Sequence, residues 1–202
     1  MENDINTILT FMKESRKFQL TYRFTPKPDG GFESDAEHSW SVAFMCMMLA
    51  SRLEKEFDIH LDQSRMLKMA LIHDLAEMET GDTKPWDTEA RIGKEEKERK
   101  AMQKITETLP EDLHEEIISL WEECEKRETL EAKIVKSIDR IDPVIHRVTF
   151  GISWKGVVEE EHATQEAFDS RQLYRHEFSK TLTTLYEAVR AEALEKGMLK
   201  AE

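Results

Sequence analysis

The sequence predicts an all-α fold, a helical bundle formed as a single domain over residues 1–202. Apolar residues recur at three- and four-residue spacing through most of the chain, which is the pattern of amphipathic helices. We find no segment with the strict apolar–polar alternation of a half-buried strand, and no internal repeat. Only 7 glycines and 5 prolines occur in 202 residues, too few for a loop-rich chain. This length suits one domain with a sizeable core.

The N-terminal half begins with an amphipathic segment that carries Ile8, Leu9 and Met12 on one side. Ser34 and Glu37 have the spacing of a capping box, so a second helix is expected to start there. A stretch rich in proline and glycine before it reads as a loop. The expected helices of this half span residues 5–19, 34–57 and 62–81, with the loop at 25–31.

Proline and threonine residues place the helices of the C-terminal half. Pro110 fits the first turn of a helix, and Thr129 begins a long one that Pro143 can kink or end. We expect a helix at 94–109 whose mixed charges face solvent, helices at 110–124 and from 129 onward, and C-terminal helices within 157–197.

The charge balance restricts the classes of partner. The chain has 29 basic and 42 acidic side chains, a net charge of −13, which disfavours nucleic acid polymers and anionic membranes. Cys46 and Cys124 have no metal-type spacing and imply no disulfide framework. No signal pattern and no apolar run of transmembrane length is present. We therefore expect a cytoplasmic protein that does not enter the membrane.

An adjacent histidine–aspartate pair, His73 and Asp74, is the most informative feature for function. An isolated pair of this kind is weak evidence, and a single histidine is more often a surface residue than a ligand. This pair, however, lies in an apolar stretch, where buried polar groups need partners or a metal. Together with His38 and Asp139, it forms a mixed nitrogen and oxygen set that can hold one divalent metal and activate water.

Several motifs in fixed order resemble those of the HD-domain metal-dependent phosphohydrolases, and most of all the 5'-deoxynucleotidase-like branch. The resemblance covers roughly three fifths of the chain, with core motifs between residues 23 and 139. The matching segments are SDAEHSW at 34–40, HDLAE at 73–77, GD at 81–82, KEEKER at 94–99, and EAK leading to ID at 131–139.

The resemblance implies a role for each matching residue. The ligands of a single divalent metal (Mn, Co, Fe, Mg or Zn) would be His38, His73, Asp74 and Asp139. Glu77 is the candidate to orient or deprotonate the attacking water, because it lies on the same side of the helix as the pair. Candidate substrate contacts are Arg23 for the phosphate, Asp82 for the sugar, and Lys84 as a second phosphate contact. Phe24 stands where the branch often has tryptophan, so no stacking role is assigned to it.

The expected activity is that of a metal-dependent phosphomonoesterase, which removes the 5'-phosphate from (deoxy)nucleoside monophosphates. Two alternatives stay open: an HD-type phosphodiesterase or nucleotide triphosphate hydrolase, and a non-catalytic helical metal-binding scaffold. The sequence also leaves open whether the chain forms a homodimer; the candidate surfaces are the helices at 111–123 and 165–193.

Overall fold

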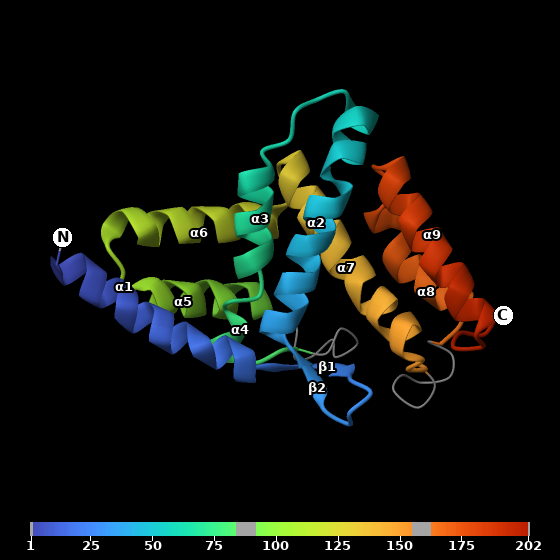
Figure 1. Ribbon diagram of the computed structural model, residues 1–202, viewed down its shortest axis with the longest axis horizontal. Helices are drawn as coiled ribbons and strands as arrows, with labels where there is room; N and C mark the ends of the chain where they lie inside the picture. Colours follow the sequence, from blue (N-terminus) through green and yellow to red (C-terminus); the bar gives the residue numbers. More distant parts are fainter. Residues whose placement is uncertain (1, 84–91, 155–162, 202) are drawn as a thin grey trace.

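The computed structural model describes residues 2–83, 92–154 and 163–201, and almost all of its regular structure is helical (Figure 1). Its elements are α1 (Glu2–Glu14), η1 (Ser15–Leu20), β1 (Tyr22–Pro26), β2 (Phe32–Ser34), α2 (Asp35–Phe57), α3 (Gln63–Ile72), α4 (Glu77–Thr80), α5 (Lys94–Thr106), α6 (Glu111–Lys126), α7 (Leu130–Phe150), α8 (Gln165–Gln172), η3 (Leu173–Arg175) and α9 (Lys180–Glu195).

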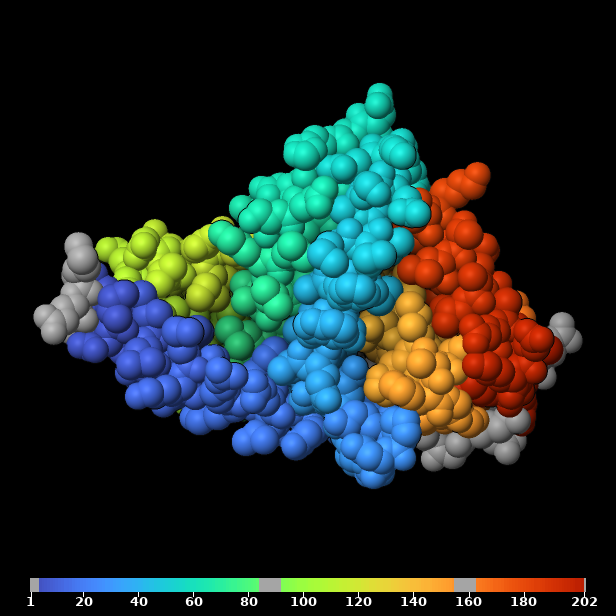
Figure 2. Space-filling model, viewed as in Figure 1, coloured from blue at the N-terminus to red at the C-terminus, as the bar shows by residue number. Residues whose placement is uncertain are grey.

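Helix α7 organises the bundle, because it contacts α2, α3, α6 and α9. Figure 1 shows α2 and α3 next to it in the centre, α1, α5 and α6 on one side, and α8 and α9 on the other. The space-filling view shows the N-terminal and C-terminal segments at opposite ends of the long axis (Figure 2). The bundle predicted from the sequence is confirmed.

Local capping explains where two of the central helices begin. The Ser34 hydroxyl accepts from the amide of Glu37, and the Glu37 carboxylate accepts from the amide of Ser34 at 2.8 Å. This is the predicted capping box, and it satisfies two amides that the first turn leaves unpaired. Thr129 caps α7 by accepting from the amide of Ala132.

The helix predicted for 62–81 is interrupted. Helix α3 ends at Ile72, and a turn at 73–76 precedes the short helix α4. Amides in this turn bond to carbonyls three residues earlier, as from Leu75 to Ile72 and from Glu77 to Asp74. In a regular helix, adjacent side chains point about 100° apart. Both His73 and Asp74 nevertheless reach one cluster, because each side chain offers an atom within 4.8 Å of the other ligand atoms.

A further expectation needs correction. Strands β1 and β2 form a small antiparallel hairpin, with Tyr22 opposite Ser34, where the sequence predicted no strand. They are too short for an alternating pattern, and their pairing depends on the chain folding back at the expected loop. Of the two effects expected of Pro143, a kink or an end of the helix, the structure excludes the second, because α7 continues to Phe150. The ring nitrogen of Pro143 cannot donate the helical hydrogen bond to the carbonyl of Asp139.

Two clusters of buried apolar side chains hold the bundle together. The larger joins α2, α3, α7 and α9 and includes Leu53, Met69 and Ile138. The smaller joins η1, α5 and α6 and includes Trp121, whose side chain is 2% exposed. Ile72, at the end of α3, packs against both clusters. The end of α3 is therefore held from two sides immediately before the histidine–aspartate pair.

Among the described residues, more of the exposed large apolar side chains lie on α1 and α2 than in the two ranges considered as dimer surfaces, where Tyr174 is exposed. Those on α1 and α2 are Ile5, Leu9, Met12, Trp40, Phe44, Met47 and Met48. The apolar side of the first helix is thus only partly covered. Within the described part of the chain, none of the helices is long and apolar enough to cross a bilayer.

Candidate metal centre

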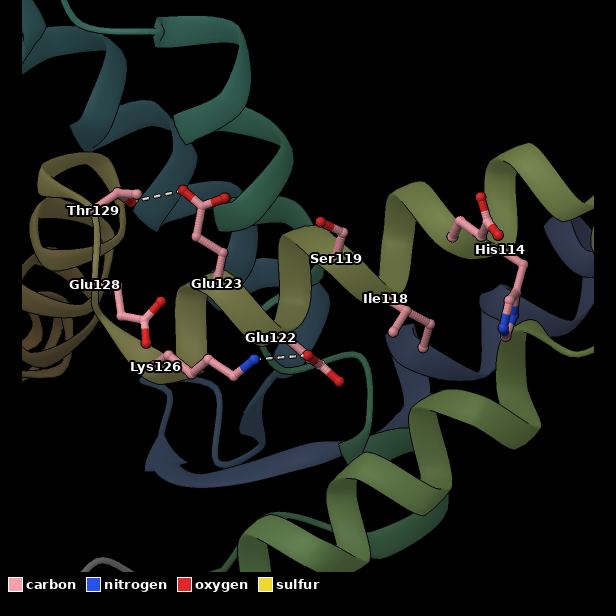
Figure 3. Close-up of a pocket in the computed structure, with 9 residues that line it drawn as sticks. His114, Ile118, Ser119, Glu122, Glu123, Lys126, Glu128 and Thr129 are labelled. Carbon is pink, nitrogen blue, oxygen red and sulfur yellow. Dashed lines mark hydrogen bonds and ion pairs between the residues drawn. The ribbon is translucent and has the colours of Figure 1, made fainter.

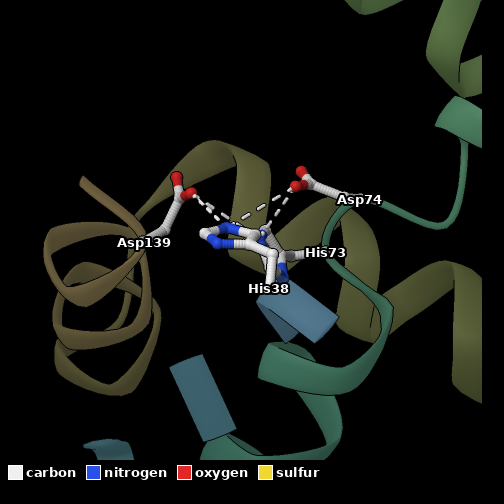
Figure 4. Close-up of side chains that lie close together, drawn as sticks. All are labelled: His38, His73, Asp74 and Asp139. Carbon is white, nitrogen blue, oxygen red and sulfur yellow. Dashed lines mark hydrogen bonds and ion pairs between the residues drawn. The ribbon is translucent and has the colours of Figure 1, made fainter. Parts of the chain in front are cut away.

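The structure brings together the four predicted metal ligands from three separate elements (Figure 4). His38 lies in the first turn of α2, His73 and Asp74 lie in the turn after α3, and Asp139 lies in the middle of α7. One nitrogen or oxygen atom of each lies within 4.8 Å of the corresponding atoms of the other three. Both imidazole rings are almost fully buried, so the cluster forms part of the core.

The hydrogen bonds of the two imidazoles set their tautomers. Nδ1 of His73 lies 2.8 Å from the carbonyl oxygen of Ala70, which can only accept, so Nδ1 carries the proton. Nδ1 of His38 lies 2.8 Å from a carboxylate oxygen of Asp142 and donates in the same way. When the rings are neutral, each Nε2 atom then has its lone pair directed into the cluster. Nε2 of His73 is buried and has no hydrogen-bond partner among the described residues.

This donor set fits a divalent cation. Nε2 of His38 faces an oxygen of Asp139 at 3.1 Å, and Nε2 of His73 faces an oxygen of Asp74 at 3.2 Å. Two lone pairs facing two carboxylates repel one another unless a positive charge lies between them. Imidazole nitrogen with carboxylate oxygen suits several first-row metals, and four protein ligands leave positions free on a six-coordinate ion.

The pKa values reflect the same demand for positive charge. Burial lowers the pKa of His73, but the neighbouring carboxylates of Asp74 and Asp139 outweigh it and raise that pKa to about 10. Burial opposes ionisation of Asp139, yet its two neighbouring histidines hold its pKa well below the usual range. Without metal, the cluster therefore binds protons strongly. A metal that binds to the same nitrogen and oxygen atoms would release these protons.

Glu77, the proposed water-activating residue, is the first residue of α4 and is buried. Its Oε1 atom lies 3.2 Å from Nζ of Lys94, while its Oε2 atom is buried and has no partner in the described structure. Burial and the charges of Asp74 and Asp82 raise its pKa to about 9, against the effects of Arg23 and Lys94. A cation bound nearby would favour its carboxylate form.

Arg23 lies on β1 and reaches a metal ligand. Its Nη1 atom lies 2.5 Å from an oxygen of Asp74 and 3.6 Å from an oxygen of Asp35. Burial lowers its pKa, but the carboxylates of Asp74 and Asp82 raise it well above the ordinary value. Its Nε atom is buried without a described hydrogen-bond partner. The guanidinium is therefore charged and has an unused donor beside the cluster.

Asp82 is close enough to Arg23 and Glu77 to raise the pKa of each, and it also contacts the hairpin. One of its carboxylate oxygens accepts from the amide of Phe24 at 3.3 Å, so it contacts the middle of β1. Lys84, the other candidate phosphate contact, lies outside the described residues.

Sequence reasoning missed three residues around the site. Asp35 is fully buried, and neither of its oxygens has a hydrogen-bond partner among the described residues. Burial, and to a smaller extent the negative charge of Asp74, raise its pKa to about 7. Asp142 contacts His38. Lys94 contacts Glu77, and its partner Glu98 is buried at 7% exposure. The charged helix α5 therefore does not face only solvent, although the spacing of Lys94 and Glu98 resembles a surface pair.

A hollow away from the metal centre lies along α6 and is lined mainly by charged side chains (Figure 3). Two pairs of its polar side chains bond to each other: Lys126 donates to Glu122 at 2.9 Å, and Thr129 donates to Glu123 at 2.6 Å. None of the four clustered ligands lines it. An acidic lining of this kind is unfavourable for a phosphate, so the metal centre is the better candidate site.

Comparison with known proteins agrees with this centre. The sequence matches the family described as HD domain over residues 16–182. The human protein named 5'-deoxynucleotidase HDDC2 is 36% identical over 124 residues, which are 61% of this chain and 55% of that protein. The match to the Bos taurus protein of the same name likewise spans only 55% of its length. The Dictyostelium discoideum protein of that name is 34% identical over 78% of this chain and 84% of its own.

A solved structure extends the likeness to nearly the whole fold. A protein from Magnetospirillum magnetotacticum, described as a predicted metal-dependent phosphohydrolase, has 34% sequence identity and a TM-score of 0.82. The match covers 98% of this chain and 97% of that one. With the family match over most of the sequence and the clustered histidines and aspartates at its centre, this chain belongs to the HD-domain family.

Proposed function

We propose that this protein is a metal-dependent phosphomonoesterase that removes the 5'-phosphate from (deoxy)nucleoside monophosphates. The observation that carries the proposal is the cluster of His38, His73, Asp74 and Asp139 with the guanidinium of Arg23 beside it. The names of the similar proteins support the nucleotide substrate. The net charge of −13 favours a small substrate over a nucleic acid polymer.

The residues around the cluster would have different roles in phosphate ester hydrolysis. A divalent ion held by the four ligands would acidify water and neutralise charge on the phosphate oxygens. Glu77 would accept the proton of the attacking water, since its Oε2 atom is unpaired and its carboxyl lies close to Asp74. Arg23 would bind phosphate through donors that Asp74 does not occupy, and a guanidinium suits paired phosphate oxygens. Asp82 and Lys84 remain candidate substrate contacts.

The two alternatives have less support. A phosphodiesterase or triphosphate hydrolase would need more positive charge for a larger anionic substrate, and Lys94 is already paired with two glutamates. A non-catalytic scaffold would have no use for the unpaired donor of Arg23 and the unpaired oxygen of Glu77, both buried at the site. Structural metal sites are usually closed, whereas this ligand set leaves positions open.

We further propose that residues 1–202 form one domain. The contact of Ile72 with both apolar clusters supports this. The metal would be one of Mn, Co, Fe, Mg or Zn, because a mixed histidine and carboxylate set accepts several of these ions.

Phosphate release tests the activity. Metal-stripped protein is assayed with 5'-deoxynucleoside and ribonucleoside monophosphates, triphosphates and a diester, each with one added metal. We expect metal-dependent release from the monophosphates that disappears in Asp74→Ala. Hydrolysis of only the diester or the triphosphates would favour the phosphodiesterase or triphosphate hydrolase alternative. No release by protein that binds metal would favour the scaffold.

A further inference from the structure

The two imidazoles of the metal centre are held by different groups. Nδ1 of His73 donates to a backbone carbonyl, that of Ala70, whereas Nδ1 of His38 donates to a carboxylate oxygen of Asp142 at 2.8 Å. Asp142 lies on α7 three residues after Asp139 and is 5% exposed. A buried carboxylate there needs a partner, and the ring of His38 supplies it.

Asp142 is itself part of a longer chain of contacts. The carboxylate of Glu33, on β2, lies within 4.8 Å of both the Asp142 carboxylate and the His38 ring, and it is 3% exposed. Its Oε1 atom lies 3.4 Å from Nδ1 of His146. Nε2 of His146 lies 2.9 Å from the carbonyl oxygen of Pro26, at the end of β1. This series of contacts thus connects a metal ligand to the hairpin.

We propose that Asp142 is a positioning residue that fixes the ring of His38, and that Glu33 and His146 extend this support to the β1–β2 hairpin. The inference rests on the proposed metal centre. A carboxylate that accepts from a metal-bound histidine fixes the tautomer and orientation of the ring and makes its other nitrogen a stronger ligand. Helix α7 would then contribute to metal binding twice, directly through Asp139 and indirectly through Asp142.

The charges along the chain are compatible with this arrangement. Two buried carboxylates, Glu33 and Asp142, lie close together and would repel one another without a nearby positive charge. Burial lowers the pKa of His146, but its contacts with Glu33 and Pro26 outweigh this and raise the pKa. Proton binding to His146 would supply a compensating charge on the hairpin side, and a metal on His38 would supply one on the other.

The hairpin connection gives the network a second consequence. The carbonyl that His146 binds is on the strand that carries Arg23 at its other end. Loss of His146 would therefore loosen the placement of the guanidinium while leaving the four ligands intact. Asp142 variants should act mainly on metal affinity, and His146 variants mainly on the KM for a phosphate substrate.

Metal titration of stripped protein tests the role of Asp142. We expect Asp142→Ala to weaken Mn²⁺ or Zn²⁺ binding roughly 10- to 100-fold, the range found for partners of ligating histidines. Asp142→Asn keeps the shape and an acceptor but removes the charge, so an intermediate affinity is expected. Ser137→Ala is the matched control, because this buried serine lies on the same helix and donates instead to His176.

The outcomes separate the inference from the function on which it rests. Wild-type affinity in folded Asp142→Asn and Asp142→Ala, or an equal loss in Ser137→Ala, would overturn the role of Asp142. Should the alanine variant fail to fold, the nearly isosteric asparagine variant decides alone. If the wild-type protein binds no metal, the metal centre itself is refuted.

Steady-state kinetics test the extension to the hairpin. We expect His146→Ala to raise the KM for a nucleoside monophosphate severalfold with nearly unchanged metal affinity. His146→Gln should recover much of the loss, because its amide can donate to Pro26. An unchanged KM in His146→Ala would overturn this part of the proposal.

Discussion

Arg23 donates from Nη1 to the Asp74 carboxylate at 2.5 Å, so the proposed phosphate-binding cation and a metal ligand are in direct contact. The pair joins the strand β1 to the turn after α3, two segments far apart in the sequence. A phosphate bound to the metal would therefore lie within reach of the guanidinium. The contact also means that a change at Arg23 alters the charge around Asp74.

Replacement of Arg23 should affect substrate more than metal. Arg23→Ala removes a charge-assisted donor, which typically contributes about 1.5–3 kcal/mol, and should lower kcat/KM for a monophosphate roughly 10- to 100-fold. Metal affinity should be retained or increased, because a cation next to Asp74 is lost. Arg23→Lys should recover only part of the activity, since lysine lacks the fork. Arg65→Ala, which breaks an ion pair with Glu123, is the control. Unaltered kinetics in Arg23→Ala would return this residue to a structural role.

Glu77→Gln should separate catalysis from metal binding. The amide keeps the size of the side chain but cannot accept a proton from water, so kcat should fall roughly 10²- to 10⁴-fold. Metal content, measured on the purified protein, should stay at the wild-type level. Glu79→Gln is a matched control on the same short helix, because Glu79 points to the surface and pairs with Lys104. A turnover rate in Glu77→Gln equal to that of Glu79→Gln would contradict the catalytic assignment.

Metal should stabilise the fold, because the ligands come from three elements that must be folded to meet. At a metal concentration of 100 times Kd, the added free energy of unfolding is about 2.7 kcal/mol. Thermal unfolding should shift upward with metal in the wild type and in Asp112→Ala, a change at an exposed residue of α6. Asp74→Ala should show no such shift. A shift of wild-type size in that variant would exclude Asp74 as a ligand.

His176 should make stability depend on pH. It is fully buried, accepts from Ser137 at 2.7 Å, and burial with the charges of Arg175 and Arg140 lowers its pKa from 6.5 to about 4. The unfolded chain therefore binds a proton at a higher pH than the folded protein. The neutral ring therefore makes its full contribution to the free energy of unfolding above about pH 6.5. This contribution, up to about 3 kcal/mol, is lost as the pH falls toward 4.

Urea unfolding of metal-stripped protein at pH 7 and pH 5 measures this effect. His176→Gln can still accept from Ser137 but does not titrate, so its stability should fall less between the two pH values than that of the wild type. The difference between the two proteins isolates His176 from the other histidines. Identical pH dependence in both would show that another group is responsible.

Much of the fold could be read from local sequence signals. The capping box of Ser34 and Glu37, the cap at Thr129 and the helical periodicity placed the start of α2 and α7 correctly. The residues that form these contacts are only a few positions apart in the sequence, so the contacts form whenever the local helix forms. The hairpin and the break after Ile72 were missed, since pairing of short strands and a turn shaped by packing depend on contacts distant in sequence.

For the site, the sequence alone determined which residue types were available and which motifs carried them. Tertiary structure decided the roles that depend on neighbours. It placed Asp142 behind His38, Lys94 against Glu77, and Arg23 against Asp74. A lone aspartate or lysine on an amphipathic helix has no local feature that distinguishes a surface charge from a buried partner. Only the packing of the helices fixes which charges lose water, and thereby which of them must bind a ligand or one another.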